Sequence, residues 1–198
     1  MFRISDRQVF DTIIPTILKI EGGLVDDVRD SGKITKAGVS LKFLEMNGID
    51  IDGNGVVDLN DIIALNNDKI KDIYYEYFWK RGKVGEIYKA TSKSNTTIAT
   101  QVFDMIVNLG IVGGSKLLQE AMNKELKKIN LPPIVVDGLV GSITLNMLKK
   151  IKNYRSLNNN MVDSRILKYA RIVRALPVKA CFLVGWINRA IKFRIFGR

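Results

Sequence analysis

The sequence predicts a mainly α-helical fold. Apolar residues recur at helical spacing in several segments, and short runs of glycine, proline and small polar residues separate these segments. The alternation typical of strands is scarce outside residues 24–40, which predict an irregular segment or a small β-hairpin. The 198 residues, 46% of them hydrophobic, are enough for one good-sized domain or two small lobes.

The first helix has a clear beginning and end. Ser5 and Gln8 form a capping-box pattern at its start. Pro15 predicts either a kink or the start of a second helical half, and the glycine pair at residues 22–23 predicts the end of the helix. Helical spacing relates Phe10, Ile13, Ile14, Ile17 and Leu18, and Glu21 lies on the same stripe.

The rest of the chain predicts further helices with polar connections. The predicted helices cover residues 40–47, 59–65, 68–80, 97–109, 115–129, a segment from about 142, and two last segments separated by Pro177. Asp68 is the expected cap of the third of these, and the polar run at 153–160 predicts a loop. The aromatic residues Tyr75, Phe78 and Trp79 either belong to the core or stack on a sugar ring.

Composition limits the chemistry. The chain has no histidine and one cysteine, Cys181, so catalysis has to use carboxylates, hydroxyls or amines, and an internal disulfide is excluded. Residues 149–198 hold thirteen Lys and Arg but a single acid, Asp163, which predicts a polyanionic partner. No classical signal peptide or long apolar run is visible, so we expect synthesis in the cytoplasm as a soluble chain.

Glu21 is the first candidate catalytic residue. A carboxylate on a buried helix face loses solvation when ionised, and the resulting preference for the protonated form suits a general acid for glycosidic bonds. The glycines that follow leave room for a polymer, and Asp26, Asp27 and Asp30 offer a second carboxylate. The alternative is a solvent-facing glutamate beside an ordinary Asp/Gly turn.

The run DIDGNGVVDLND at residues 50–61 fits the calcium loop of an EF-hand. Four carboxylates in twelve residues repel one another unless a hard cation neutralises them. Asp61 replaces the usual bidentate glutamate, which predicts reduced affinity; the alternative is an acidic loop without calcium. The predicted ligands are Asp50, Asp52, Asn54, Val56 through its carbonyl, Asp58 and Asp61.

Several blocks, in order along the chain, resemble the glycoside hydrolase family 108 muramidases. EGGLVDDVRDSGKITKAGVS resembles the family's opening motif, DIYYEYFWK its Ile-Tyr-x-x-x-Tyr-Trp helix, and VFDMIVNLG with LLQEAMN its central segments. VVDGLVGSIT resembles the start of the family's peptidoglycan-binding region, and FLVGWINR its closing Phe-Leu-x-Gly-Trp-x-Asn-Arg. Leu24, Val28, Ser31 and Lys33 depart from the motif, where the family has tyrosine, two prolines and a glycine.

The resemblance implies a lysozyme-like helical fold, a small hairpin near the active site, and cleavage between N-acetylmuramic acid and N-acetylglucosamine. It implies a catalytic region at 1–130, with the calcium-type loop inside it, and a basic helical peptidoglycan-binding region at 131–198. Glu21 is then the proton donor. Asp30 and Thr35 assist catalysis, Asp27 and Gly38 contact the substrate, and no catalytic cofactor is needed, although a structural calcium ion fits.

Three questions stay open from the sequence. Asp104 and Asn108, one helical turn apart, either bind acetamido groups in a sugar cleft or form a structural pair that anchors the Glu21 helix. Trp186 lies on a basic amphipathic segment that either meets a membrane or packs onto the fold. The protein itself is either a muramidase, an inactive peptidoglycan-binding protein or a basic membrane-active protein.

The expected partners follow from the favoured function. We expect bacterial peptidoglycan, together with anionic wall polymers or a membrane surface, and neither nucleic acid nor a second copy of the chain. The enzyme would act in the periplasm or cell wall after release by a holin or a dedicated system.

Overall fold

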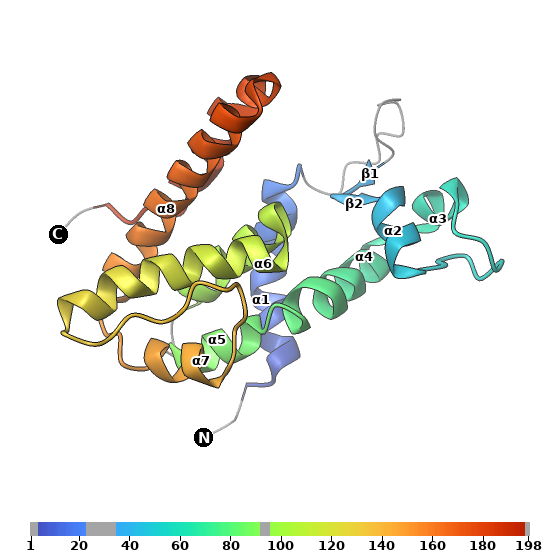
Figure 1. The fold of residues 1–198 in the computed structure, drawn as a ribbon. Coiled ribbons are helices and arrows are strands. Elements are labelled where there is room, and N and C mark those ends of the chain that lie inside the picture. Colours follow the sequence, from blue (N-terminus) through green and yellow to red (C-terminus); the bar gives the residue numbers. More distant parts are fainter. Residues whose placement is uncertain (1–3, 23–34, 92–95, 197–198) are drawn as a thin grey trace. The chain divides into compact units, whose positions relative to one another are not determined.

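The computed structural model describes residues 4–22, 35–91 and 96–196, and the chain is mainly α-helical (Figure 1). It divides into two compact units, residues 1–77 (unit 1) and 78–198 (unit 2). The division expected at residues 130 and 131 concerns function and stays a prediction.

Unit 1 begins with helix α1, Asp6–Ile20. The predicted capping box is present, since the Ser5 hydroxyl accepts from the Gln8 backbone and the Gln8 side chain accepts from the Ser5 backbone. Pro15 lies inside the continuous helix rather than at its start. The apolar stripe is buried, as predicted, and consists of Val9, Phe10, Ile13, Ile14, Ile17 and Leu18.

A short antiparallel hairpin and two short helices follow. Strands β1 (Thr35–Lys36) and β2 (Val39–Ser40) pair with Thr35 opposite Ser40 and Lys36 opposite Val39. Helices α2 (Leu41–Asn47) and α3 (Leu59–Ala64) flank the acidic loop and agree with the predicted ranges. The hairpin confirms that the strand signal lies near residues 24–40.

Helix α4 (Asn67–Ile73) runs directly into a π-helix, η1 (Tyr74–Lys80). The N-cap of α4 is Asn66, whose side chain accepts from the Lys69 backbone N–H. The prediction of Asp68 as the cap is therefore wrong by two residues. Asp68 lies in the first turn, where a carboxylate is favoured by the helix dipole. π-Helices are rare, and the sequence gives no signal for this one.

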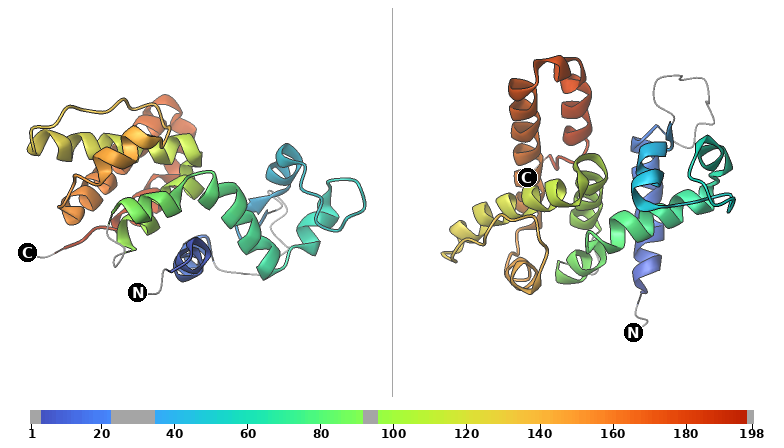
Figure 2. Two further views of the ribbon diagram at one scale, coloured as in Figure 1. Left: turned by 90° about the horizontal axis from the view of Figure 1, so that it is seen from below. Right: turned by 45° about the vertical axis from the view of Figure 1, so that its right-hand side comes forward.

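Unit 2 is a set of helices around a core centred on α6. The elements are α5 (Val84–Ala90), α6 (Thr97–Lys128), α7 (Ser142–Leu148), α8 (Tyr154–Ala175), the 3-10 helix η2 (Pro177–Phe182) and α9 (Leu183–Ile191). Helix α8 packs against α6, and α9 returns beside α8 (Figure 2). The sequence did not predict α5.

Helix α6 combines the two helices predicted at 97–109 and 115–129. The break between them is a single residue, Gly110, whose φ of 76° and ψ of 165° are not helical. By length and composition α6 alone, among the described helices, could cross a membrane, but half of that stretch is buried inside the fold. Because Gly110 also interrupts it, we describe α6 as the core helix of unit 2.

Helix α8 corrects the prediction of a polar loop at 153–160. Asn153 caps the helix by accepting from the Ser156 backbone, and Leu157 and Asn158 are buried. The asparagine run therefore faces partly inward. Asn158 donates to the Phe193 carbonyl at 2.6 Å, and Asn159 donates to the Ile195 carbonyl at 3.1 Å. These bonds fasten the segment after α9 to α8, a contact that composition alone does not reveal.

Candidate active site

Glu21 lies at the C-terminal end of α1. It is the capping residue, its backbone N–H donates to the Ile17 carbonyl at 3.0 Å, and its side chain is half-buried. Gly22 follows with a φ of 100°, which an L-residue adopts only at a cost. The glycine therefore ends the helix directly after the carboxylate, as the sequence predicts.

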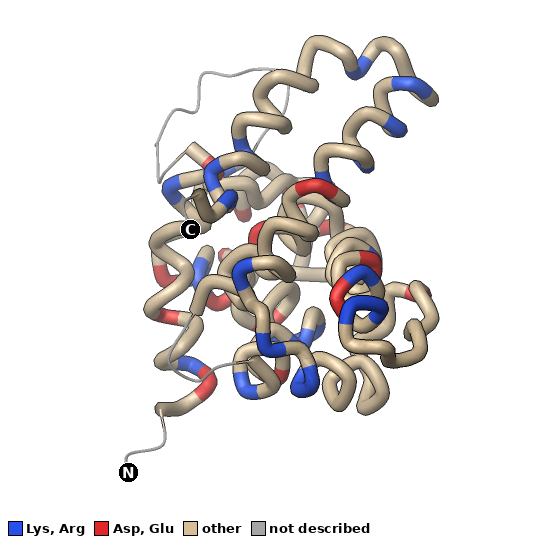
Figure 3. Tube along the Cα trace, turned by 90° about the vertical axis from the view of Figure 1, so that its left-hand side faces the viewer, with Lys and Arg blue, Asp and Glu red and all other residues tan. Residues whose placement is uncertain are grey.

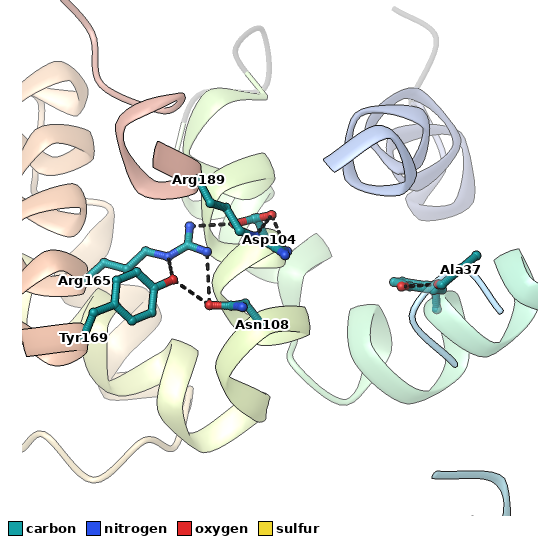
Figure 4. Close-up of polar contacts among 7 residues, drawn as sticks. Ala37, Asp104, Asn108, Arg165, Tyr169 and Arg189 are labelled. Carbon is teal, nitrogen blue, oxygen red and sulfur yellow. Dashed lines mark hydrogen bonds and ion pairs between the residues drawn. The ribbon is translucent and has the colours of Figure 1, made fainter. Parts of the chain in front are cut away.

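The turn between β1 and β2 consists of Ala37 and Gly38. Both have positive φ, 48° and 82°, which is the arrangement of a two-residue type I′ hairpin turn. Positive φ is unfavourable for alanine, so the turn needs support from outside. Tyr74, at the start of η1 and 1% exposed, supplies it, since its hydroxyl donates to the Ala37 carbonyl at 2.9 Å (Figure 4).

Gly38 brings the hairpin against the Glu21 carboxylate. A methyl carbon built at Gly38 would lie 2.7 Å from Tyr74 Oη and 3.4 Å from Glu21 Oε2. Only a residue without a side chain fits there without displacing one of these groups. Glu21, Gly38 and Tyr74 therefore form one small polar cluster, which we call the Glu21 cluster.

The other predicted catalytic residues are only partly visible. Asp27 and Asp30 lie outside the described residues. Thr35 contributes its backbone to β1, opposite Ser40. Their assignments stay predictions.

The acidic loop brings three carboxylates together. One oxygen from each of Asp50, Asp52 and Asp61 lies within 4.8 Å of the others. Gly53 and Gly55 have positive φ, and their N–H groups donate to Asp50 at 2.6 and 2.7 Å. A converging set of carboxylate oxygens is what calcium prefers, so these residues fit the ion.

Asp61 is fixed by backbone donors. Its carboxylate accepts from Asp58 at 2.7 Å and from Ile51 at 2.5 Å. The Asp58 N–H is the main reason why the pKa of Asp61 lies below its usual range. The remaining predicted ligands have local partners as well. Asn54 Oδ1 accepts from the Val56 N–H, and Asp58 caps α3 through the Asn60 N–H.

Asp104 and Asn108 belong to a buried ion-pair network in unit 2 (Figure 4). The Asp104 carboxylate is fully buried and pairs with Arg165 of α8 at 2.5 Å and Arg189 of α9 at 2.8 Å. Asn108 Oδ1 accepts from the Tyr169 hydroxyl at 2.6 Å and from Arg165 at 3.3 Å. This geometry favours the structural alternative, in which the two residues hold helices together. Their partners lie on α8 and α9, whereas the prediction named the Glu21 helix as the one they would anchor. The sugar-contact assignment stays a prediction.

The aromatic residues are largely structural. Trp79 is fully buried and meets Phe103 edge to face at 5.2 Å between ring centroids, and Tyr75 meets Phe10 at 5.0 Å. Trp186 packs on Tyr169 at 5.2 Å, which is the packed alternative. Tyr74, Arg165 and Arg189 were not singled out from the sequence, although Tyr74 and Arg189 lie in motif blocks that carried a signal.

Comparisons with known proteins identify two matching regions in the chain. Residues 14–110 match the model of the family described as glycosyl hydrolase 108, and residues 113–191 match a predicted peptidoglycan domain. Gly110, the non-helical residue in α6, lies at the junction between the two matches. A search of curated proteins finds no match.

Solved structures show the same fold. The structure of SagA from Brucella abortus superposes with a TM-score of 0.66 at 23% identity, covering 95% of this chain and 92% of that one. At this identity the likeness shows the fold alone, and it confirms the mainly α, lysozyme-like architecture. With the two family matches in order over most of its length, the chain belongs to glycosyl hydrolase family 108 and carries a C-terminal peptidoglycan-binding region.

Proposed function

We propose that the protein is an N-acetylmuramidase, which cleaves the β-1,4 bond between N-acetylmuramic acid and N-acetylglucosamine in peptidoglycan, with Glu21 as the general acid. Family membership supports a glycoside hydrolase that acts on peptidoglycan. The choice of bond follows the resemblance to the family's muramidases, and the choice of acid is supported by the position of Glu21. No histidine is present to take the acid's role.

The observation that carries the proposal is the position of the Glu21 carboxylate. It lies at the end of a helix whose apolar face is buried, and close to the hairpin turn at Gly38. A carboxyl group at a fixed helix end is suited to act on one oxygen of a bound polymer. Gly38 keeps a side chain away from the carboxylate on the hairpin side, because a Cβ there would lie 3.4 Å from Glu21 Oε2.

In the proposed reaction, Glu21 protonates the leaving glycosidic oxygen as the bond to the anomeric carbon breaks. Positive charge develops on the ring, and Asp30 with Thr35 stabilises it or directs the attacking water. Whether the anomeric configuration is retained or inverted depends on the separation between the two carboxyl groups. Asp27 and Gly38 would contact the glycan.

Unit 2 would hold the enzyme on the wall. It contains the peptidoglycan-domain match and most of the Lys and Arg residues of the chain. Anionic wall polymers are attracted to such a surface, and the attraction weakens as salt screens it.

The test is digestion of purified peptidoglycan by the wild type, Glu21→Gln and a control, Glu45→Gln, which changes an exposed glutamate of α2. We expect new reducing ends on muramic acid from the wild type and the control, detected by mass spectrometry. Glu21→Gln should lose roughly 10²–10⁴-fold in rate. Reducing ends on glucosamine, or full activity of Glu21→Gln, would contradict the proposal. Intact glycan with wall-bound wild type would identify a binding protein.

We further propose that the loop at 50–61 binds a structural calcium ion through Asp50, Asp52 and Asp61, with Asn54, Val56 and Asp58 completing the set. The convergence of three carboxylates supports this. Calcium should raise the melting temperature of the wild type and have little effect on Asp52→Ala. An equal shift in both proteins would refute it.

A further inference from the structure

The end of the C-terminal helical hairpin exposes a group of apolar side chains. We call residues 174–184 the hairpin tip; they comprise the last two residues of α8, Leu176, all of η2 and the first two residues of α9. Every residue from 174 to 182 is exposed. The large apolar side chains of the tip and their exposed fractions are Leu176 at 52%, Val178 at 81%, Phe182 at 52% and Val184 at 70%.

The hairpin does not need these side chains for its own packing. Its interior is formed by Val162, Tyr169 and Ala190, with Ile172, Leu183 and Trp186 packed against them. Phe182 lies at the edge of this interior. Its ring stacks on Trp186 at 5.8 Å between centroids, and about half of the residue is exposed to solvent. Exposed apolar residues that gather at one point, rather than scatter singly, indicate an interaction site.

Basic residues surround the apolar tip, and no acid accompanies them. The chain has no Asp or Glu after Asp163. Arg165 and Arg189 are committed to Asp104, and Arg194 pairs with Asp163. The exposed remainder near the tip consists of Lys168, Arg171, Arg174 and Lys179. Figure 3 shows Lys and Arg, without Asp or Glu, along the outer part of this hairpin.

We propose that the hairpin tip docks on the surface of an anionic phospholipid bilayer. Apolar side chains such as Val178 and Phe182 would enter the interface between headgroups and acyl chains. The arginines and lysines behind them would meet the lipid phosphates, with their aliphatic stems along the apolar region. The apolar side chains of the tip match the acyl region of the bilayer, and the basic residues around them match its anionic headgroups.

Two other occupants match only one property each. A hydrated wall polyanion would neutralise Arg171 and Arg174 but offers no apolar medium for Val178 and Phe182. A second copy of the chain could cover the apolar residues, but a symmetric contact through the tip would bring its own Arg174 and Lys179 close to like charges. The bilayer is therefore the occupant that charge and apolarity favour together.

The chain contains a natural reporter for the test. Its single cysteine, Cys181, is exposed in the middle of the tip. The full chain labelled there with an environment-sensitive fluorophore should shift to the blue on phosphatidylglycerol vesicles, and lipids brominated along the acyl chain should quench it. Phosphatidylcholine vesicles should give little change. A control label on Cys181→Ser/Lys150→Cys, far along the chain in the same unit, should not respond.

Vesicle co-sedimentation of unlabelled variants separates the two contributions. Val178→Asp/Phe182→Asp should weaken binding by roughly tenfold or more. Arg171→Gln/Arg174→Gln should weaken it by a similar factor, and added salt should have the same effect. The matched control Lys127→Gln/Lys150→Gln removes the same charge from exposed positions elsewhere in unit 2 and should bind nearly as the wild type does.

Four results would overturn the proposal. The first is an equal loss of vesicle binding in the lysine control and the arginine variant, which would indicate general electrostatic attraction, and the second is unchanged vesicle binding of Val178→Asp/Phe182→Asp. The third is binding to purified wall polymer but not to vesicles. The fourth is a dimer of the wild type that Val178→Asp/Phe182→Asp dissociates. The labelled chain keeps the test decisive if a variant fails to fold. None of these readings depends on muramidase activity.

Discussion

The side-chain hydroxyl of Tyr74 donates a hydrogen bond to the carbonyl oxygen of Ala37 across 2.9 Å, although 37 positions separate the two residues in sequence. The bond joins the first residue of a π-helix to a hairpin turn that contains an alanine with positive φ. Since the next residue of the turn lies against Glu21, the bond also sets where the proposed catalytic acid meets the hairpin.

Replacing Tyr74 with phenylalanine should therefore affect both stability and activity. Tyr74→Phe removes a buried donor, which should lower the free energy of unfolding by about 1–2 kcal/mol. It should also reduce peptidoglycan hydrolysis, because the turn loses its support beside Glu21. Denaturant titration and a hydrolysis assay measure the two effects. Tyr154→Phe, which removes the same atom at the start of α8, is the control, and equal activity losses in both would exclude the specific role.

Gly38→Ala tests the close approach of the hairpin. The new methyl group would meet Tyr74 Oη and Glu21 Oε2, so we expect a large loss of hydrolysis. Gly48→Ala is the matched control, because Gly48 also has positive φ but nothing within 4 Å of the added carbon. Both should cost about 1 kcal/mol of stability through the backbone. Similar activity in the two variants would show that Gly38 serves the turn alone.

The parts of this fold that were predictable are those with a local cause. The capping box at Ser5, the buried stripe of α1 and the glycine after Glu21 all follow from spacing and backbone preference. The polar run at 153–160 misled for the opposite reason, since its asparagines bond to residues some 35 positions away. Local composition carries no trace of such long-range partners.

The candidate sites divide in the same way. The acidic loop is continuous in sequence, so its carboxylates could be grouped before the structure was known. The roles of Tyr74 and Arg165 depend on contacts with distant residues, and only tertiary structure supplies those. Asp104 illustrates the limit, because the spacing to Asn108 gives the shared helix face but not the arginines that occupy it.

Breaking the buried network in unit 2 should be costly. Arg165→Met leaves the Asp104 carboxylate with Arg189 alone in a site without solvent, and should lower the free energy of unfolding by roughly 3 kcal/mol. Arg171→Met, an exposed position on the same helix, should change it by less than about 0.5 kcal/mol. Denaturant titration compares the two. A small effect at Arg165 would mean that the pair contributes little beyond a hydrophobic side chain of similar size.

Asp137 should contribute to the loss of stability at acid pH. The Gln119 amide, which donates to its carboxylate at 2.8 Å, is the main cause that lowers the pKa of Asp137, and the Leu139 N–H adds to it. Because the pKa is lower in the folded than in the unfolded state, the stabilisation is complete above the unfolded value of about 4. It is lost as the pH falls through the folded value.

Asp137→Asn should therefore be less stable than the wild type at pH 7 and lose less stability below pH 4, as measured by thermal unfolding across that range. Asp68→Asn, at an exposed position of α4, is the comparison. An acid-induced loss in Asp137→Asn as steep as in the wild type would show that other carboxylates cause it.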